Sequence, residues 1–539
     1  MKMKMKKRAF RCRNIYTAVS PELIDGYVIC EGSRIIFAGT ADKAAEHIDG
    51  NTEVLDFEDN FIMPGFHDFH VHSLTGAFME KDGVLRHANS EEEAAAMLYA
   101  KNRDDSGDRW IMGGAWDNFR WPGTKLPTRE SLDRYFKNTP VFLLNKECHG
   151  AWLNSEALRR FSITRDTPDP ENGSYFRDAD GEPTGYVHEA AVIPMLRSIL
   201  SEMSMEELSG DAEAFAKTAG RCGITSVGDL PLYGVRAEPA YRILEDKGKL
   251  SVRINFAIDF KEEIDEILRT KEAYSSEMLR CIGVKDFLDG TPMGHTGFML
   301  EDYTDMPGFR SEPMIDPEHL KERVAQMAAN DIKVRLHACG DGAVRLGLDA
   351  FEYAKSMYGD RDLRHCIEHI EAISPDDIKR FGQLGVIASV QPDHLPKYSF
   401  YEHPFHTMIG EERMRYSWPF RSIADAGGRL AFGTDYPVTE LNPLRGIFRA
   451  VTRLTDELQP EGGFSPDEKL TVHSSLQAYT YGSAFAADRE NELGSLEPGK
   501  LADLTILDSN VFECAYDKDA MFGMDVLMTV VGGETVYSK

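Results

Sequence analysis

The stretch MPGFHDFHVH, residues 63–72, contains the pattern that decides how this chain folds. Pro64 and Gly65 are turn residues that end one extended segment and orient the next. In an extended chain alternate side chains share a face, so His70 and His72 lie on the same side, where two imidazoles can bind one metal ion. A His-x-His pair taken alone is equally compatible with packed or surface histidines, so the rest of the chain has to decide.

Short apolar runs alternate with amphipathic helical segments from about residue 222 onward, as in strands joined by helical crossovers. Residues 60–66 supply one predicted strand upstream. The other seven predicted strands are residues 224–229, 252–258, 281–287, 333–337, 364–369, 386–391 and 429–435. Eight strands separated by helices predict an α/β fold, a (β/α)8 TIM barrel, although an open doubly wound sheet has the same local pattern.

Metal-ligand side chains close three more of these strands. His337, His369 and Asp435 each end an apolar run and precede a loop or helix. With His70 and His72 they make five candidate ligands at the same ends of four strands. Because the carboxyl ends of parallel strands meet at one rim of a barrel, we expect these side chains to converge.

Lys285 lies near the end of the predicted strand 281–287, within reach of the same rim. An ammonium group repels cations and is not a ligand. A deprotonated lysine there can instead take up carbon dioxide as a carbamate and become an oxygen donor that bridges two metals. A lysine paired with Asp286 or Asp289 explains the residues equally well, so both interpretations stay open.

The two ends of the chain contain brief β-type runs and turns with no room for helices. We therefore expect residues 1–59 and 493–539 to form one small β-sandwich domain, with the barrel domain spanning residues 60–492. A long insertion at residues 73–200 follows the first barrel strand and holds four of the five tryptophans. At the carboxyl end of a barrel strand it is placed to act as a lid.

Composition excludes several classes of partner. The chain has 61 Lys and Arg against 89 Asp and Glu, a formal charge of −28 that repels nucleic acid and anionic lipid. It lacks an apolar stretch of the roughly 18 residues that a membrane helix needs, and no secretory signal is evident. Its eight cysteines are scattered, without disulfide spacing. We expect a cytoplasmic protein with a small-molecule substrate, no nucleic-acid or membrane partner, and an undetermined oligomeric state that allows a homo-oligomer.

These motifs, in this order and spacing, resemble the metal-dependent amidohydrolase superfamily. Within it they are most similar to the YtcJ-like branch, amidohydrolase family 3, which is related to N-substituted formamide deformylases. The motifs that carry the resemblance are residues 64–72, 285–290, 337–342, 367–369, 433–438 and 494–503. The resemblance covers nearly the whole chain and implies a distorted (β/α)8 barrel with a terminal β-sandwich.

The resemblance also implies a ligand set. His70 and His72 would bind one divalent metal, and His337 and His369 a second. The resemblance further implies that Lys285 is N6-carboxylated and bridges the two ions, and that Asp435 is both a ligand and the proton acceptor. One or two zinc ions fit this mixture of imidazole and carboxylate best, with iron, manganese and nickel as alternatives.

The insertion carries further motifs that this branch tends to share. They make Trp116, Asp117, His149 and Glu189 candidate substrate-binding residues, together with Asp289 at the barrel rim. The His149 motif departs from the usual order, because glycine follows the histidine instead of preceding it. For Trp116, aromatic packing within the lid is the simpler interpretation.

The implied reaction is hydrolysis of an amide-like C–N bond of a small molecule by a metal-activated water. Asp435 would take the proton of the water and pass it to the leaving nitrogen. One alternative is a mononuclear aminohydrolase, or deaminase, which typically needs no lysine at a strand end, so metal content separates the two. Another is a non-catalytic metal-binding regulatory protein, against which stands the completeness of the ligand set.

Overall fold

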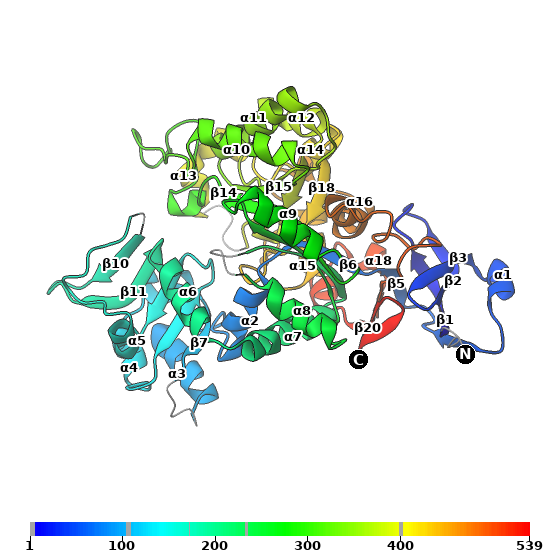
Figure 1. Cartoon of the computed structure of the whole chain (residues 1–539), viewed down its shortest axis with the longest axis horizontal. Helices are drawn as coiled ribbons and strands as arrows, with labels where there is room; N and C mark the ends of the chain where they lie inside the picture. Colours follow the sequence, from blue (N-terminus) through cyan, green and yellow to red (C-terminus); the bar gives the residue numbers. More distant parts are fainter. Residues whose placement is uncertain (1–5, 104–108, 172, 232–235, 398–402) are drawn as a thin grey trace.

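A computed structural model describes residues 6–103, 109–171, 173–231, 236–397 and 403–539 (Figure 1). At its centre eight parallel strands pair in sequence order. They are β6 (Phe66–Val71), β12 (Ile224–Asp229), β13 (Arg253–Asp259), β14 (Leu279–Phe287), β15 (Val334–Ala338), β16 (Cys366–His369), β17 (Ile387–Val390) and β18 (Arg429–Phe432). Helices connect and cover them, so the strands are almost wholly buried, as parallel sheets require.

The helices follow the amphipathic segments of the sequence closely. Around the barrel lie α7 (Met205–Arg221), α8 (Glu238–Asp246), α9 (Ile264–Ala273), α10 (Pro317–Ala329), α11 (Asp341–Tyr358), α12 (Pro375–Leu384), α13 (Pro404–Met414), α14 (Phe420–Asp425), α15 (Pro443–Thr452), α16 (Val472–Gln477) and α17 (Ser483–Ala486). In α12, Pro375 starts the first turn and Gly385 ends the helix with a left-handed φ of 69°. No helix in the described ranges is both long and apolar enough to cross a membrane.

The barrel closes through the residues that follow β18. The backbone N–H of Asp435 donates to the carbonyl oxygen of His70 over 2.7 Å, and that of His72 donates to Tyr436 over 2.7 Å. Gly433 permits this approach, because a Cβ there would lie 2.5 Å from the His70 backbone nitrogen. The first and last strands are thus joined, which excludes an open sheet and confirms the predicted barrel.

The predicted barrel strand at residues 60–66 is wrong, because the chain divides at Gly65. Residues before it form β5 (Phe61–Pro64), which pairs outside the barrel, and the barrel strand begins at Phe66. The Gly65 N–H donates to Asp503 over 2.9 Å, and a Cβ at Gly65 would lie 2.2 Å from Thr225. Close packing at this glycine therefore separates two strands that hydropathy alone merges.

Both ends of the chain contribute to one eight-stranded sheet, which lies beside the barrel (Figure 1). Its strands are β1 (Lys7–Tyr16), β2 (Leu23–Glu31), β3 (Arg34–Thr40), β4 (Thr52–Asp56), β5, β19 (Leu504–Leu507), β20 (Val526–Val531) and β21 (Glu534–Ser538). Contrary to expectation, short helices also occur, namely α1 (Ala41–Ala44), α18 (Val511–Cys514) and α19 (Lys518–Gly523). A buried ion pair between Arg253 and Asp503, 2.7 Å from Nε to Oδ2, ties the sheet to the barrel. The domain boundaries stay predictions.

The insertion forms a lobe on the side of the barrel away from the terminal sheet (Figure 1). Its five-stranded sheet has the order β10 (Gly173–Arg177), β11 (Pro183–Glu189), β9 (Gly150–Leu153), β8 (Val141–Asn145) and β7 (Ile111–Trp116). Its helices are α2 (Ser73–Lys81), α3 (Glu91–Lys101), α4 (Arg129–Asp133), α5 (Ser155–Arg160) and α6 (Val192–Glu202). A hydrophobic cluster of its own stabilises this lobe, and residues of the lobe line the cavity at the barrel rim.

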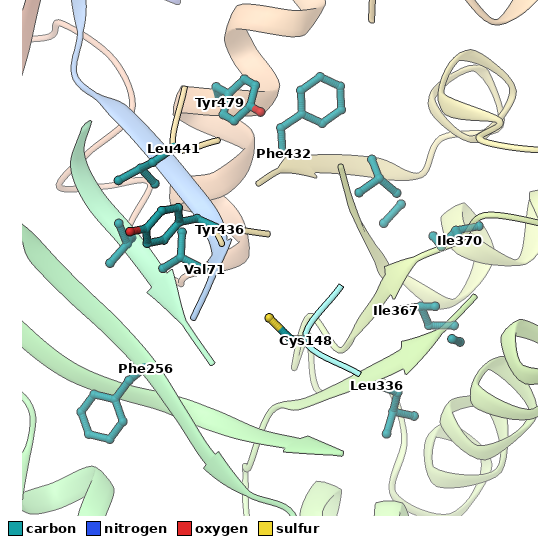
Figure 2. Close-up of a cluster of buried hydrophobic side chains, with 14 of the residues drawn as sticks. Val71, Cys148, Phe256, Leu336, Ile367, Ile370, Phe432, Tyr436, Leu441 and Tyr479 are labelled. Carbon is teal, nitrogen blue, oxygen red and sulfur yellow. The ribbon is translucent and has the colours of Figure 1, made fainter. Parts of the chain in front are cut away.

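The insertion also contributes side chains to the barrel core. Cys148 belongs to the main hydrophobic cluster, which includes Val71 of β6 and Leu336 of β15 (Figure 2). Its Sγ lies 3.7 Å from the sulfur of Met79 in α2. The loop between β8 and β9 is therefore anchored at the mouth of the barrel.

Candidate functional site

His70 is held by a buried carboxylate. Its Nδ1 lies 2.7 Å from Oε2 of Glu368, and the other oxygen of this carboxylate, Oε1, accepts from Nε of Arg335 at 2.7 Å. Burial alone would raise the pKa of Glu368, but Arg335 and His70 hold it well below its ordinary value. Because an ionised carboxylate only accepts, Nδ1 must donate, and Nε2 is the nitrogen that a metal ion would bind. His70 Nε2 has no hydrogen-bond partner among the described residues.

His72 and His369 are oriented in the same way by neutral acceptors. His72 Nδ1 lies 3.1 Å from the carbonyl oxygen of Leu230, and His369 Nδ1 lies 2.9 Å from Oε1 of Gln391. A backbone carbonyl can only accept, which fixes the Leu230 contact, and the Gln391 amide oxygen does the same for His369. In each ring Nε2 is left available for a ligand.

His337 uses the opposite nitrogen. Its Nε2 lies 3.1 Å from the carbonyl oxygen of Gly290 and 3.3 Å from Sγ of Cys339. Its ring centroid is 4.3 Å from that of His369. The Gly290 contact makes Nε2 the donor and leaves Nδ1 of His337 with the lone pair.

Asp435 lies among these rings. Its Oδ1 is 3.1 Å from Nε2 of His72 and 3.3 Å from Nε2 of His70, while Oδ2 is 3.4 Å from Nε2 of His394. Burial opposes its charge, yet His70 and His72 hold the pKa of Asp435 well below its usual range. Its φ of 56° is left-handed, a strained conformation of the kind found at functional sites.

Lys285 is buried beneath the cluster. Its Nζ has no hydrogen-bond partner among the described residues. Burial lowers its pKa to about 8, although Glu368 acts in the opposite direction. The structure shows no ion pair from Lys285 to either predicted carboxylate: Asp286 pairs with Lys261 at 3.5 Å, and Asp289 binds backbone amides. Of the two interpretations left open by the sequence, the salt-bridged lysine is not the one observed.

Asp289 braces a loop and does not line the cavity. Its Oδ1 accepts from the Cys339 amide at 3.0 Å, and Oδ2 accepts from the amides of Gly340 at 2.8 Å and Phe298 at 2.9 Å. Burial raises its pKa to about 8 in spite of these hydrogen bonds. Asp289 therefore lies behind His337, and its predicted contact with substrate is not what the structure favours.

A cavity of about 430 Å³ is lined by His337, His369 and Asp435 of the barrel rim. The insertion supplies part of its lining, namely Asp117, Phe119, Arg120, Lys146, Glu147 and His149. Glu189 stands behind His149, with Oε2 3.0 Å from Nδ1 of that ring. Of the candidate substrate-binding residues in the insertion, Asp117 and His149 reach the cavity directly, and Glu189 reaches it through His149.

Trp116 is not brought to the cavity. Its side chain is fully buried in the core of the insertion, where its ring stacks on Trp121 and meets Trp152 edge to face. Its Nε1 donates to the carbonyl oxygen of Leu143 over 3.0 Å. The packing interpretation therefore accounts for Trp116, because both its ring and its donor are already engaged within the lobe.

The sequence motifs did not single out four residues that lie beside the ligands in the structure: Arg335, Glu368, Gln391 and His394. Arg335 lies two residues before His337 in the same strand, so period-2 alternation was a usable signal for a charge facing the same interior. Gln391 ends a predicted strand and His394 follows it closely. Glu368 directly precedes His369, whose imidazole is the stronger sequence signal for a metal ligand.

The donor set fits a divalent cation. Two groups of buried side chains have ligand atoms within 4.8 Å of one another: His70 with His369 and Asp435, and His337 with Asp289 and Cys339. Buried polar atoms without partners are rare, yet His70 Nε2, Lys285 Nζ and Asp435 Oδ1 all lack a hydrogen bond here. Nitrogen and carboxylate donors left open in this way are typical of metal sites.

Residues 53–537 match a family described as "Amidohydrolase family". The chain belongs to the amidohydrolase family. The resemblance predicted from the motifs is thereby confirmed, and this amidohydrolase is a hydrolase of a metal-dependent superfamily.

Three similar proteins match this amidohydrolase over nearly its full length. Protein LONG AFTER FAR-RED 3 of Arabidopsis thaliana is 31% identical, with 97% of this chain and 90% of the relative covered. N-substituted formamide deformylase of Arthrobacter pascens is 27% identical, with 95% of each covered. The crystal structure of an uncharacterized metal-dependent hydrolase from Pyrococcus furiosus has a TM-score of 0.74 and 27% identity, covering 94% of this chain and 100% of the other.

Proposed function

We propose that this amidohydrolase hydrolyses an amide-like C–N bond of a small molecule at a divalent metal centre, with zinc as the first choice of metal. The residues that would hold the metal are His70, His72, Lys285, His337, His369 and Asp435. One observation carries the proposal: four buried histidines each engage one ring nitrogen with a protein acceptor, and the other nitrogens of His70 and His72 lie 3.3 and 3.1 Å from Oδ1 of a buried carboxylate, Asp435. The similarity to an N-substituted formamide deformylase supports an amide-like bond as the bond that is cleaved.

A divalent cation held by these residues would supply a nucleophilic water at neutral pH and would polarise the substrate carbonyl. Asp435 accepts one proton of that water as its oxygen bonds to the carbonyl carbon and the carbonyl π electrons move to oxygen. The oxyanion then re-forms the double bond and the C–N bond breaks. Asp435 returns the proton to the leaving nitrogen, so one amide and one water give an acid and an amine.

The residues around the ligands orient them for this chemistry. Glu368 fixes the tautomer of His70, and Arg335 keeps Glu368 ionised. Second partners of this kind typically change metal affinity by 10- to 100-fold when removed. The low pKa of Asp435 keeps it ionised, so that it can receive the proton of the water.

Lys285 is suited to become a carbamate. With its pKa lowered to about 8, a fraction of Lys285 is neutral at neutral pH. Its Nζ would bond to the carbon of carbon dioxide and release a proton to solvent, and the new carboxylate would offer two oxygens. This step would let the site hold two ions, whereas the unmodified amine favours one.

The decisive experiment is a hydrolysis screen with metal-reconstituted protein on N-substituted formamides, N-acyl amines and small esters. Release of a primary amine, measured by fluorescence after derivatisation, would support the proposal. Ammonia from a ring amidine, with one metal per chain, would instead support the deaminase alternative. Metal binding with no turnover of any substrate would support a non-catalytic role. The small-molecule substrate, the cytoplasmic location and a possible homo-oligomer remain part of this proposal.

A further inference from the structure

Three imidazoles that line the cavity lie outside the set of proposed metal ligands, namely His149, His394 and His403. His149 comes from the loop between β8 and β9 of the insertion and lines the same cavity as His337, His369 and Asp435. Its Nδ1 lies 3.0 Å from Oε2 of Glu189, and no described residue makes a hydrogen bond to its Nε2. The carboxylate accepts from Nδ1 and favours the charged form of the ring, in which Nε2 also carries a proton that it can present to the cavity.

The backbone around this pair is fixed at both ends. The Glu189 N–H donates to the carbonyl oxygen of His149 over 2.7 Å, and the Gly150 N–H donates to Oδ1 of Asn145 over 3.0 Å. Cys148 and Glu189 have φ values of 63° and 52°. Left-handed residues other than glycine cost about 1–3 kcal/mol each and persist where the surroundings impose them, commonly at functional sites.

The anchor of the loop holds His149 over the barrel. Cys148, the preceding residue, is buried in the cluster that also contains Val71, Leu336 and Tyr436 (Figure 2). Burial opposes a charge on His149, but Glu189, followed by weaker contributions that include Asp435, raises its pKa. His149 and Asp435, the proposed proton acceptor, therefore line one cavity and interact electrostatically across it.

Three other side chains of the cavity, Lys146, Lys397 and His394, already face carboxylates. Lys146 lies 3.3 Å from Oδ2 of Asp117, and Lys397 lies 2.9 Å from Oδ2 of Asp393. His394 faces Asp435 at 3.4 Å. Among these, His149 differs because its carboxylate partner occupies one ring nitrogen and leaves a second N–H donor for a ligand.

We propose that His149 is a further catalytic residue, which donates its Nε2–H to the carbonyl oxygen of the substrate as that oxygen gains negative charge, and that Glu189 is its positioning residue. This inference rests on the proposed hydrolysis. The carbonyl π electrons move to oxygen as the water oxygen bonds to carbon, and His149 stabilises the resulting charge without giving up its proton. Preorganised donors of this kind contribute about 10²- to 10³-fold to turnover.

The test compares His149→Phe, Glu189→Gln and Glu189→Ala on any amide that the wild type hydrolyses. His149→Phe should lower kcat by about 10²- to 10³-fold with KM within about threefold, since the donor acts on the transition state. Glu189→Ala should lower kcat by about tenfold or more, and Glu189→Gln should recover part of the loss because its amide oxygen still accepts from Nδ1. The folded state is checked by circular dichroism and metal content, which should match the wild type.

The chain offers a matched control outside the cavity. His295 Nε2 lies 3.0 Å from Oδ2 of Asp305, with a similar partial exposure. His295→Phe and Asp305→Asn should leave kcat unchanged. An unchanged kcat in His149→Phe, or equal losses in the control variants, would overturn the inference while leaving the proposed hydrolysis intact.

A second measurement does not depend on turnover. Binding of methylphosphonate, a tetrahedral anion, to the zinc-loaded protein is followed by calorimetry. His149→Phe should bind it at least tenfold more weakly than the wild type, and His295→Phe should not differ. Equal binding by the wild type and His149→Phe overturns the inference. If the wild type hydrolyses no amide, the proposed function fails and the catalytic role fails with it, whereas this measurement still shows whether His149 binds a tetrahedral anion.

Discussion

The backbone N–H of Asp435 donates to the carbonyl oxygen of His70 over 2.7 Å, so the hydrogen bond that closes the barrel also joins two candidate metal ligands. The side-chain oxygen Oδ1 of Asp435 then lies 3.3 Å from Nε2 of the same histidine. The distance between these ligands is set by the pairing of the first strand with the segment after the last. The geometry of the site thus depends on closure of the whole fold.

Asp435→Asn should leave a folded, metal-loaded protein whose turnover falls by about a hundredfold or more. The amide keeps the size of the side chain and the backbone hydrogen bond, but it cannot accept the proton of the water. The measurements are kcat and metal content per chain. Undiminished hydrolysis by the variant would contradict the role assigned to Asp435.

Glu368→Gln should weaken metal affinity by about 10- to 100-fold, because the amide oxygen can still accept from Nδ1 of His70 but lacks the negative charge that raises the basicity of the ring. Zinc affinity is measured by competition with a chelating dye. Asp503→Asn is the matched control, since Asp503 also forms a buried pair with an arginine, Arg253, at 2.7 and 2.9 Å. Both variants should lose stability, but only Glu368→Gln should lose metal affinity. Equal affinities would show that Glu368 serves packing alone.

Trp116→Ala should lower the free energy of unfolding of the insertion by about 3–5 kcal/mol, the usual cost of removing a buried tryptophan. Phe119, three residues later, is 63% exposed and lines the cavity. Phe119→Ala should leave stability within about 0.5 kcal/mol and change KM. Urea unfolding followed by circular dichroism gives the first quantity, and initial rates give the second. The opposite pattern would mean that the two aromatic residues have exchanged roles.

His67 should make the fold sensitive to acid. Its ring is buried in the barrel, and burial, assisted by Arg489 and Arg335, lowers its pKa from 6.5 to about 3. The unfolded chain therefore binds a proton that the folded chain does not, so the stabilising contribution is present above about pH 6.5 and is lost as the pH falls toward 3. Between about pH 7 and pH 5 the loss from this group is about 2 kcal/mol.

The variant His67→Leu isolates this contribution from that of the other histidines. It keeps an apolar side chain of similar size and cannot titrate. The difference in unfolding free energy between wild type and variant should change by about 2 kcal/mol from about pH 7 to pH 5, with the wild type losing more. A difference that does not vary with pH would show that His67 is protonated in the folded protein.

Sequence by itself determined the alternation of strands and helices and the common strand ends at which the candidate ligands lie, because both follow from local periodicity. The choice of a barrel over an open sheet came from the family resemblance and from the hydrogen bonds that join the first strand to the segment after the last. Parallel strands end at a common rim, so His337 and His369 at the ends of their strands had to approach His70. It also located the insertion whose loops line the cavity. It did not separate β5 from β6, since both are apolar and only the close approach of Thr225 to Gly65 shows the break.

Only the tertiary structure decided which neighbours each ligand has. Glu368 binds His70 across 298 positions of the chain, and the insertion turns Trp116 inward while it presents His149 to the cavity. Alternation along a strand shows which side a residue faces but not what stands opposite. The opposing residue is set by strand register and by closure of the barrel, which are properties of the packed fold and of contacts between distant segments.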